Sequence, residues 1–298
     1  MCRKNSQCGY VYSFLQNLNV TIKAVEICYS RDEKRRNMMI KAIFFDVDGT
    51  LYSHTSHSIP KSTLAALNKL REKGIQLYIA TGRHMRELEY LRVPEAFCFD
   101  GYITLNGQYC LDHEEVIYHR PIDLEDIQCY LDYIKLNPIS TLFIEKDDMY
   151  VNFIDEHTIA AQAAISSPIE PVRDQIDGKA PIYQMCPYVS LATHQQILAS
   201  LLPHCSITSW HPQALDITPL NGTKVTGIEK IMEKYGYQKN EVMSFGDGHN
   251  DLEMMEHTGL SIAMGNANEE VKKRADYITA SVDEDGIYLA LSHFDLLK

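Results

Sequence analysis

The sequence has little positive charge and no long apolar run. Its 298 residues carry 28 Lys and Arg against 40 Asp and Glu, a formal net charge of −12. Binding to a nucleic-acid backbone requires clustered Lys and Arg, so this balance argues against a nucleic-acid-binding protein. No apolar stretch approaches the ~18 residues that a membrane-spanning helix requires. We therefore expect neither nucleic acid nor a membrane as a partner.

The cysteines lack the spacing of a metal site or of a disulfide framework. Eight are scattered along the chain, with no CxxC pair and no Cys/His ligand pattern. In a chain of this length such cysteines are expected to be reduced core residues, which is typical of a cytoplasmic protein. The length and the 45% hydrophobic content predict about two domains.

An apolar run in residues 41–51, KAIFFDVDGTL, stops abruptly at acidic residues. Residues 42–45 suit a strand that is buried on both faces of a parallel sheet. Asp46 and Asp48 follow it directly, and ligands bind beyond the carboxyl ends of strands in open α/β sheets. Two carboxylates so close repel each other, so a cation between them is expected. Hard oxygen ligands of this kind favour Mg²⁺.

Two further predicted strands end in polar residues. A strand over residues 75–80 is followed by Thr81, Gly82 and Arg83, and one over residues 102–105 is followed by Asn106. A hydroxyl followed by glycine can hydrogen-bond a phosphoryl oxygen while backbone N–H groups approach closely. The N-cap of a helix is a second interpretation of Thr81, and the two roles are compatible.

The last third of the chain shows the same pattern. A helix predicted over residues 223–235 has Lys224 in its first turn, where a cation opposes the helix macrodipole unless an anion is nearby. This placement favours a phosphate site, and a solvated surface position is the alternative. A strand over residues 242–245 runs into Asp247, Asn250 and Asp251.

The order of predicted elements indicates one domain inserted into another. Strands and helices alternate in residues 38–121 and 214–298, which predicts an α/β fold with a doubly wound, Rossmann-like parallel sheet. Residues 122–213 form a separate α+β unit. Its elements are a helix over 123–136, two strands within 141–153, and a helix over 193–202 between strands near 181–191 and 206–218.

Four features occur in a fixed order along the chain: DVDGT, TGR, Lys224 and GDGHND. This order resembles the haloacid dehalogenase-like superfamily in its phosphatase form, and it covers the chain from Met39 to near the C-terminus. The size and position of the insertion resemble the cap domain of Cof-type members. A receiver domain also pairs acidic residues with a lysine, but the inserted domain and the DxDGT order disfavour it.

The resemblance implies a Mg²⁺-dependent phosphatase that hydrolyses small phosphate monoesters through an aspartyl-phosphate. Sugar phosphates are the expected substrates, and nucleotide-like or pyridoxal phosphates are the alternatives. It implies that Asp46 is the nucleophile and Asp48 the general acid and base. Asp46, the backbone carbonyl of Asp48 and Asp247 would hold the metal, with Asp251 orienting this shell. The residues expected to contact the substrate are Val47, Thr81, Gly82, Arg83, Asn106, Lys224 and Asn250.

Two other functions fit the same residues. A phosphomutase of the phosphomannomutase type would return the phosphoryl group to a sugar instead of to water. A binding or regulatory protein on the same fold is the non-enzymatic alternative, and the intact acids speak against it. A dehalogenase of this family lacks the acid that Asp48 supplies. Cap residues that face the core would choose the leaving group, with candidates Glu145, Lys146, Tyr150, Arg173, Tyr183 and Trp210.

Residues 1–37 precede the region of resemblance. Polar residues interrupt every apolar stretch, so the continuous apolar core of a signal peptide is lacking. A basic cluster over residues 31–36 lies just before Met38 and Met39. We interpret this segment as an extension outside the fold, translated from a start assigned too early. A short targeting arm and a packed accessory helix are the alternatives.

Overall fold

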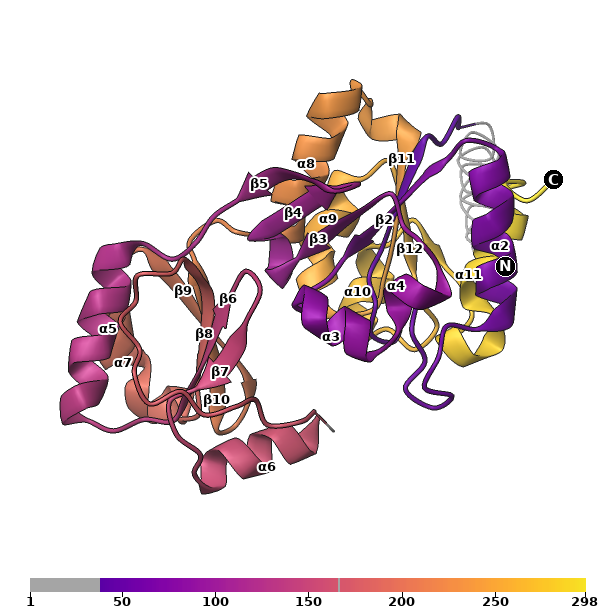
Figure 1. The fold of residues 1–298 in the computed structure, drawn as a ribbon. Helices are drawn as coiled ribbons and strands as arrows, with labels where there is room; N and C mark the ends of the chain where they lie inside the picture. Colours follow the sequence, from indigo (N-terminus) through magenta and orange to yellow (C-terminus); the bar gives the residue numbers. More distant parts are fainter. Residues whose placement is uncertain (1–37, 166) are drawn as a thin grey trace, which may run out of the picture.

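The computed structural model describes residues 38–165 and 167–298, which form two parts with one sheet each (Figure 1). The predicted extension over residues 1–37 lies outside the described residues. Among the helices that are described, none has the length and apolar character needed to cross a membrane.

The larger part, the core, contains an eight-stranded sheet in the order β13-β12-β11-β1-β2-β3-β4-β5. The strands from β13 to β3 pair in parallel, and β4 and β5 extend the sheet as an antiparallel hairpin. This order confirms the predicted α/β fold with a Rossmann-like core. The strands are β1 (Ala42–Phe45), β2 (Gln76–Ala80), β3 (Gly101–Thr104), β4 (Tyr109–Asp112), β5 (Glu115–His119), β11 (Val242–Gly246), β12 (Leu260–Ala263) and β13 (Tyr277–Ile278).

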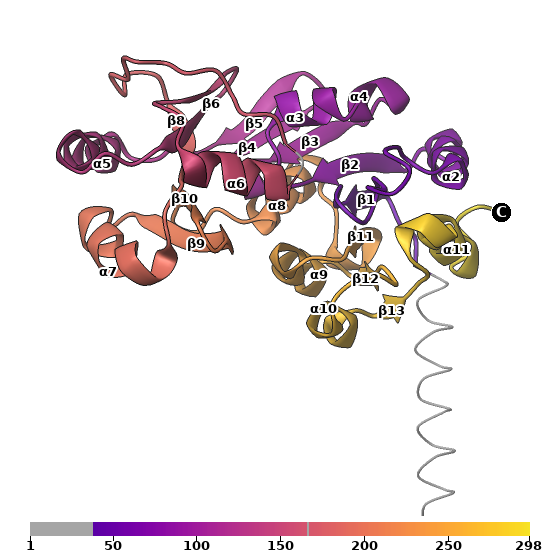
Figure 2. The ribbon, with the colours of Figure 1, turned by 90° about the horizontal axis from the view of Figure 1, so that it is seen from below.

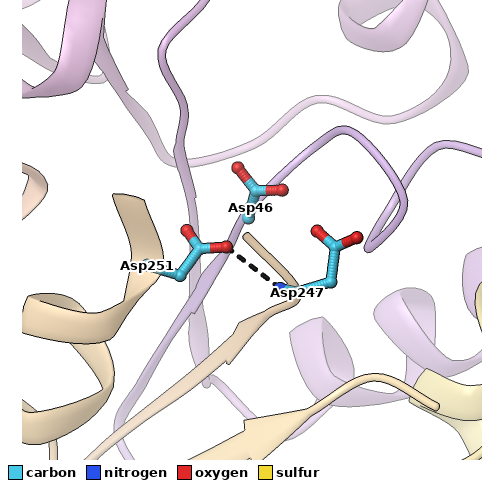
Figure 3. A group of neighbouring side chains, drawn as sticks. All are labelled: Asp46, Asp247 and Asp251. Atoms are coloured by element: carbon cyan, nitrogen blue, oxygen red, sulfur yellow. Dashed lines mark hydrogen bonds between the residues drawn. The ribbon is translucent and has the colours of Figure 1, made fainter. Parts of the chain in front are cut away.

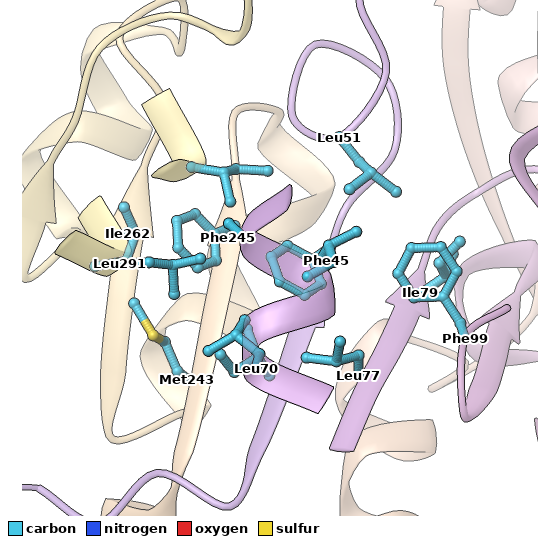
Figure 4. Packing of buried hydrophobic residues seen from close by; sticks show 14 of the residues in the cluster. Phe45, Leu51, Leu70, Leu77, Ile79, Phe99, Met243, Phe245, Ile262 and Leu291 are labelled. Carbon is cyan, nitrogen blue, oxygen red and sulfur yellow. The ribbon is translucent and has the colours of Figure 1, made fainter. Parts of the chain in front are cut away.

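Successive side chains of a strand point to opposite faces of the sheet. In the core sheet the side chains on both faces are apolar, so helices cover both faces. Ile43 and Phe45 point into one cluster, shown in Figure 4, where Phe45 stacks on Phe245 with ring centroids 5.2 Å apart. Ala42 and Phe44 join the cluster on the opposite face. The covering helices are α2 (Lys61–Glu72), α3 (Met85–Tyr90), α4 (Val93–Ala96) and α11 (Gly286–His293) on the first face, and α8 (Lys224–Tyr235), α9 (Leu252–His257) and α10 (Glu269–Arg274) on the second.

The smaller part, the cap, contains a five-stranded antiparallel sheet in the order β7-β6-β8-β10-β9. Helices α5 (Leu124–Leu136) and α7 (Leu191–Leu201) pack on one face of it, as both views show (Figures 1 and 2). The strands are β6 (Thr141–Glu145), β7 (Met149–Val151), β8 (Ile182–Pro187), β9 (Cys205–His211) and β10 (Ala214–Pro219).

The structure corrects the predicted end of the cap and adds one helix to it. The boundary expected after residue 213 separates β9 from β10, although β10 pairs with both β8 and β9, so the cap sheet continues to Pro219. Helix α6 (Glu156–Ala164) was not predicted. Its sequence is rich in alanine, and its buried positions are Thr158, Ala161 and Gln162, so it lacks the apolar stripe by which a helix is recognised.

The other face of the cap sheet lies against the core. Leu105 and Tyr109 of the core pack in one apolar cluster with cap residues such as Tyr183. Polar contacts support this packing, because His84 Nε2 lies 2.9 Å from the carbonyl oxygen of Lys146, and Arg86 Nη1 lies 3.0 Å from Asp148 Oδ1. The turn between β6 and β7 therefore holds the cap close to the carboxyl end of β2.

Candidate active site

The predicted site residues meet at one edge of the core sheet. Asp46 follows β1, Thr81 follows β2, Asn106 lies in the short helix after β3, and Asp247 follows β11. Lys224 is the first residue of α8. These strands are parallel neighbours, so their carboxyl ends place the side chains on the same side.

Three carboxylates form the centre of this site (Figure 3). Each of Asp46, Asp247 and Asp251 offers an oxygen within 4.8 Å of the others. Asp251 Oδ2 accepts hydrogen bonds from the backbone N–H groups of Asp247, at 3.0 Å, and Gly248, at 2.9 Å. The Lys224 ammonium donates to Asp46 Oδ1 and Asp251 Oδ1, each at 2.6 Å. A fully buried lysine therefore joins two of the three acids.

The charge of this cluster is not balanced. Burial and the neighbouring Asp251 raise the pKa of Asp46, and the same two causes raise the pKa of Asp247 to about 6. Burial opposes the charge of Lys224, but Asp251 and Asp46 outweigh this and raise its pKa. Three carboxylates and one ammonium leave two negative charges. Their oxygen donors fit a hard divalent cation.

We expect Asp247→Asn to stabilise the metal-free protein at neutral pH. The folded-state pKa of about 6 lies above the ordinary value, so the folded chain holds this proton more tightly than the unfolded chain. The stability of the metal-free wild type therefore falls as pH rises from the ordinary Asp pKa toward about 6. The Asn variant has no carboxyl group to titrate at this position, so its stability does not fall for this reason. Melting in EDTA at pH 7.5 should give the variant the higher Tm, while added Mg²⁺ should raise only the Tm of wild type. An equal Mg²⁺ shift in both proteins would contradict a role for Asp247 in metal binding.

Asp48 lies outside the three-carboxylate cluster. Its carboxylate accepts from Arg83 twice, at 2.7 Å from Nε and 2.8 Å from Nη2, and lies 2.8 Å from His54 Nε2. Burial opposes ionisation of Asp48, but Arg83 and then His54 hold its pKa below the ordinary value. The acids Asp46 and Asp48, two residues apart, thus have different partners and different pKa shifts.

The remaining predicted residues lie around these acids. Val47 is buried, and its carbonyl closes the turn by accepting from Tyr52 N–H at 2.7 Å. Asn250 Nδ2 donates to Asn106 Oδ1 at 3.2 Å, and a Cβ at Gly82 would lie 3.2 Å from the Asn106 amide. Gly82, Asn106 and Asn250 therefore lie together.

Thr81 has a local role that differs from one interpretation of the sequence. Its buried hydroxyl accepts from Arg83 N–H at 3.2 Å. The N-cap of the next helix, α3, is His84, whose side chain accepts from Arg86 N–H at 3.2 Å. Thr81 is therefore not the helix cap.

Three residues outside the predicted set also contact the acids, and one of them is Thr50, whose hydroxyl donates to Asp247 Oδ1 at 3.3 Å. Asn266 Nδ2 donates to Asp247 Oδ2 at 2.9 Å and to the Gly49 carbonyl at 2.8 Å. Asn266 follows β12 at the same sheet edge. A polar residue just after a predicted strand is the sequence pattern that could have indicated it. His54 lies in the loop after Asp48, and its Nε2 is 2.8 Å from Asp48 Oδ1. A loop histidine has no sequence pattern that reveals such a contact.

A cavity of about 160 Å³ lies between the cap and the core, next to this site. Gly82 and Arg83 line it from the core, and Gln184, Trp210 and Asp216 line it from the cap. A wider groove of about 810 Å³ shares Arg83 with it and includes His54.

The cap residues proposed from the sequence have mixed positions. Trp210 lines the cavity. Tyr150 belongs to the cluster on the helix-covered face of the cap sheet, and Arg173 stacks on its ring and pairs with Glu145. Tyr183 packs against the core. Of these residues, Trp210 is therefore the one placed to meet a leaving group in that cavity.

The comparisons with known proteins agree with this architecture. Residues 43–291 match the haloacid dehalogenase-like hydrolase family. YkrA of Bacillus subtilis is 31% identical over 261 residues, which cover 87% of this chain and 99% of YkrA. Pyridoxal phosphate phosphatase YbhA of Escherichia coli is 29% identical over 267 residues, which cover 84% of this chain and 97% of YbhA.

A solved structure shows the same fold. The subclass IIB sugar phosphatase BT4131 superposes with a TM-score of 0.72 at 36% identity, covering 86% of this chain and 99% of BT4131. The family match spans both segments of the core and the whole cap between them. The chain therefore belongs to the haloacid dehalogenase-like hydrolases and is an enzyme of their Cof-type phosphatase branch.

Proposed function

We propose that this chain is a Mg²⁺-dependent phosphatase that hydrolyses small phosphate monoesters, chiefly sugar phosphates, through an aspartyl-phosphate intermediate. One observation carries the proposal: buried Lys224 bridges Asp46 and Asp251 at 2.6 Å beside Asp247. Three carboxylates and one buried cation thus occupy one strand-end site, which supports a role for Asp46 as nucleophile. The similarity to the sugar phosphatase BT4131 supports the substrate class.

Asp46 is the proposed nucleophile. One carboxylate oxygen forms a bond to phosphorus while the bond from phosphorus to the leaving oxygen breaks. Lys224 favours the ionised form of this carboxylate, since its charge and hydrogen bond oppose the rise in the pKa of Asp46 that burial and Asp251 cause. Water then attacks the phosphorus of the aspartyl-phosphate, which releases inorganic phosphate and restores Asp46.

Asp48 is the proposed general acid and base. It gives a proton to the leaving alkoxide in the first step and takes a proton from water in the second. Pairing with Arg83 lowers the pKa of Asp48, so the proton-donating state requires this ion pair to open. Arg83 Nη1 also lies 3.2 Å from Glu87 Oε1, which offers a second partner when Asp48 is released.

The metal and the polar groups around Asp46 complete the proposed site. Mg²⁺, held by Asp46, Asp247 and the Asp48 carbonyl and oriented by Asp251, would neutralise negative charge on the phosphoryl oxygens. The Thr81 hydroxyl, the Lys224 ammonium and the backbone N–H groups after Asp46 are proposed to bind those oxygens. Further substrate contacts are proposed for Val47, Gly82, Arg83, Asn106 and Asn250.

We place this activity in the cytoplasm, with a small phosphate ester as the partner. The cysteines in the described part of the chain, Cys98, Cys110, Cys129, Cys186 and Cys205, are free thiols, which supports a reducing compartment.

Hydrolysis of p-nitrophenyl phosphate with and without Mg²⁺ tests the proposed function. Removal of divalent ions with EDTA should lower the rate by at least ~100-fold, because a metal supplies several kcal/mol of charge stabilisation in the transition state. Restoring Mg²⁺ should restore the rate, and the same protein kept in buffer without EDTA is the control. Full activity after complete removal of divalent ions would show that the metal is not required.

A further inference from the structure

The cavity between cap and core is bounded by the face of the cap sheet that α5 and α7 leave open. Gln184 of β8 and Asp216 of β10 line it, and alternate neighbours such as Met185 and Ile217 pack on the helix-covered face. Gly82 and Arg83 form its core side, and Arg83 binds Asp48. Through Arg83 the cavity therefore adjoins Asp48.

Two residues that line this cavity, Gln184 and Gln162, each carry a buried acceptor atom without a donor in the described part of the chain. Gln184 and Gln162 are each only 6% exposed, and their Oε1 atoms have no hydrogen-bond partner among the described residues. The orientation of the Gln184 amide follows from Asp216, whose Oδ1 accepts from Gln184 Nε2 at 2.8 Å. Gln162 Nε2 donates to Tyr188 Oη at 2.6 Å. Buried acceptors are normally paired, so these two oxygens are the acceptors beside the cavity that remain available to a donor from a ligand.

The charges that line the cavity disfavour an anion. Three carboxyl groups, those of Glu87, Glu170 and Asp216, line it together with one cation, Arg83. The donors of Arg83 are directed at Asp48 and Glu87. Burial raises the pKa of Asp216, and it raises that of Glu170 against the charge of Arg86, whose Nη2 lies 3.7 Å from Glu170 Oε2.

The size and the apolar wall of the cavity define the ligand further. Leu142, Ile144, Met149 and Trp210 form an apolar side. The volume of about 160 Å³ lies well below the ~300–1,000 Å³ typical of sites for drug-sized ligands, and Arg83, Glu87 and Glu170 also line the adjoining groove of about 810 Å³. The cavity therefore suits a small amphipathic group with an apolar face and several donors.

We propose that this leaving-group cavity selects a polyhydroxylated leaving group of about monosaccharide size that is uncharged or carries an amino group. The pair Gln184 and Asp216 determines specificity: Gln184 Oε1 accepts a hydroxyl proton of the leaving group, and Asp216 orients Gln184 and repels acidic leaving groups. The inference rests on the proposed phosphatase function and adds the chemistry by which the substrate is recognised.

Comparing phosphate esters on wild type tests the charge selection. The probes are glucose 6-phosphate, glucosamine 6-phosphate, 6-phosphogluconate and p-nitrophenyl phosphate. We expect kcat/KM for the two sugars to exceed that for the sugar acid by at least ~10-fold, since like charges in a partly buried site repel strongly. Hydrolysis of the aryl ester with no preference for the sugars over the sugar acid would overturn the inference alone. Hydrolysis of none of the four would overturn the proposed function.

Variants test the residues themselves. Gln184→Met should lower the ratio of kcat/KM for glucose 6-phosphate to that for p-nitrophenyl phosphate by about 10-fold, the upper range for one neutral hydrogen bond. The matched control is Gln195→Met on the exposed side of α7, which should keep the wild-type ratio. An unchanged ratio in Gln184→Met would overturn the role of Gln184.

Asp216→Asn gives an independent test that keeps the side-chain volume. We expect the discrimination against 6-phosphogluconate to fall by at least ~5-fold, because the repelling charge is lost. Thermal melting of each variant shows whether it is folded. Unchanged discrimination in a folded Asp216→Asn protein would contradict the role of Asp216.

Discussion

Asp46→Asn is expected to abolish phosphate release while the protein stays folded. The amide cannot act as the nucleophile, and loss of a covalent catalyst typically costs at least ~10⁴-fold in rate. The change keeps the side-chain volume, and Lys224 keeps Asp251 as a partner at 2.6 Å. It also removes one of the buried negative charges, so the melting temperature should not fall. Initial rates of phosphate release and a thermal melt measure both effects.

A surface substitution of the same kind is the control. Asp177 lies exposed in the connection before β8, where its partner is Lys179. Asp177→Asn should therefore keep wild-type activity. Phosphate release above ~1% of the wild-type rate by purified Asp46→Asn protein would exclude Asp46 as the essential nucleophile.

Lys224→Met is expected to have the largest effect on stability. The ammonium is buried, with 1% exposure, and it lies between Asp46 and Asp251. Removing one partner of a buried ion pair leaves uncompensated charge and typically costs about 3–5 kcal/mol. That is a large part of the ~5–15 kcal/mol by which domains are stable. Activity should fall by ~10³-fold, because the transferring phosphoryl group loses a cation.

The stability loss in Lys224→Met should depend on pH. Without the lysine, the folded-state pKa of Asp46 rises further above its unfolded value, since Lys224 now lowers it. The folded variant then holds more protons than the unfolded chain, so its stability falls as pH rises. Urea unfolding should show a larger deficit at pH 8 than at pH 5.5.

The control for this prediction lies on the same helix. Lys230 of α8 is 42% exposed and pairs with Glu233, so Lys230→Met should change the free energy of unfolding little. A loss below ~1 kcal/mol in Lys224→Met would mean that the buried lysine does not compensate the two acids.

The sequence contains strong signals for the centre of the site. Apolar runs that end in Asp46 and Asp247 mark strands of a parallel sheet, and parallel strands bring their carboxyl ends to one edge. The structure places both acids and Lys224 there. Strand direction predicts the common edge, whereas the adjacency of β1 and β11 and the place of Lys224 beside them were predicted by the family resemblance.

The recognition side of the site was not predictable in the same way. Gln184 and Asp216 pair across two neighbouring strands that are 32 residues apart in the sequence, so their contact depends on the register of the cap sheet. In the sequence each is a polar residue in an apolar alternation, and such a residue is usually solvated. Here the face on which they lie is covered by the core, and this tertiary packing has no local pattern.

Trapping the phosphorylated enzyme tests the central claim most directly. Asp48→Asn should still be phosphorylated by p-nitrophenyl phosphate, whose leaving group needs no proton, but it should hydrolyse the intermediate slowly because the base is missing. Acid quenching followed by peptide mass mapping should locate the phosphoryl group on Asp46. Phosphorylation of another residue, or p-nitrophenol release over many turnovers with no phosphorylated enzyme, would contradict the account.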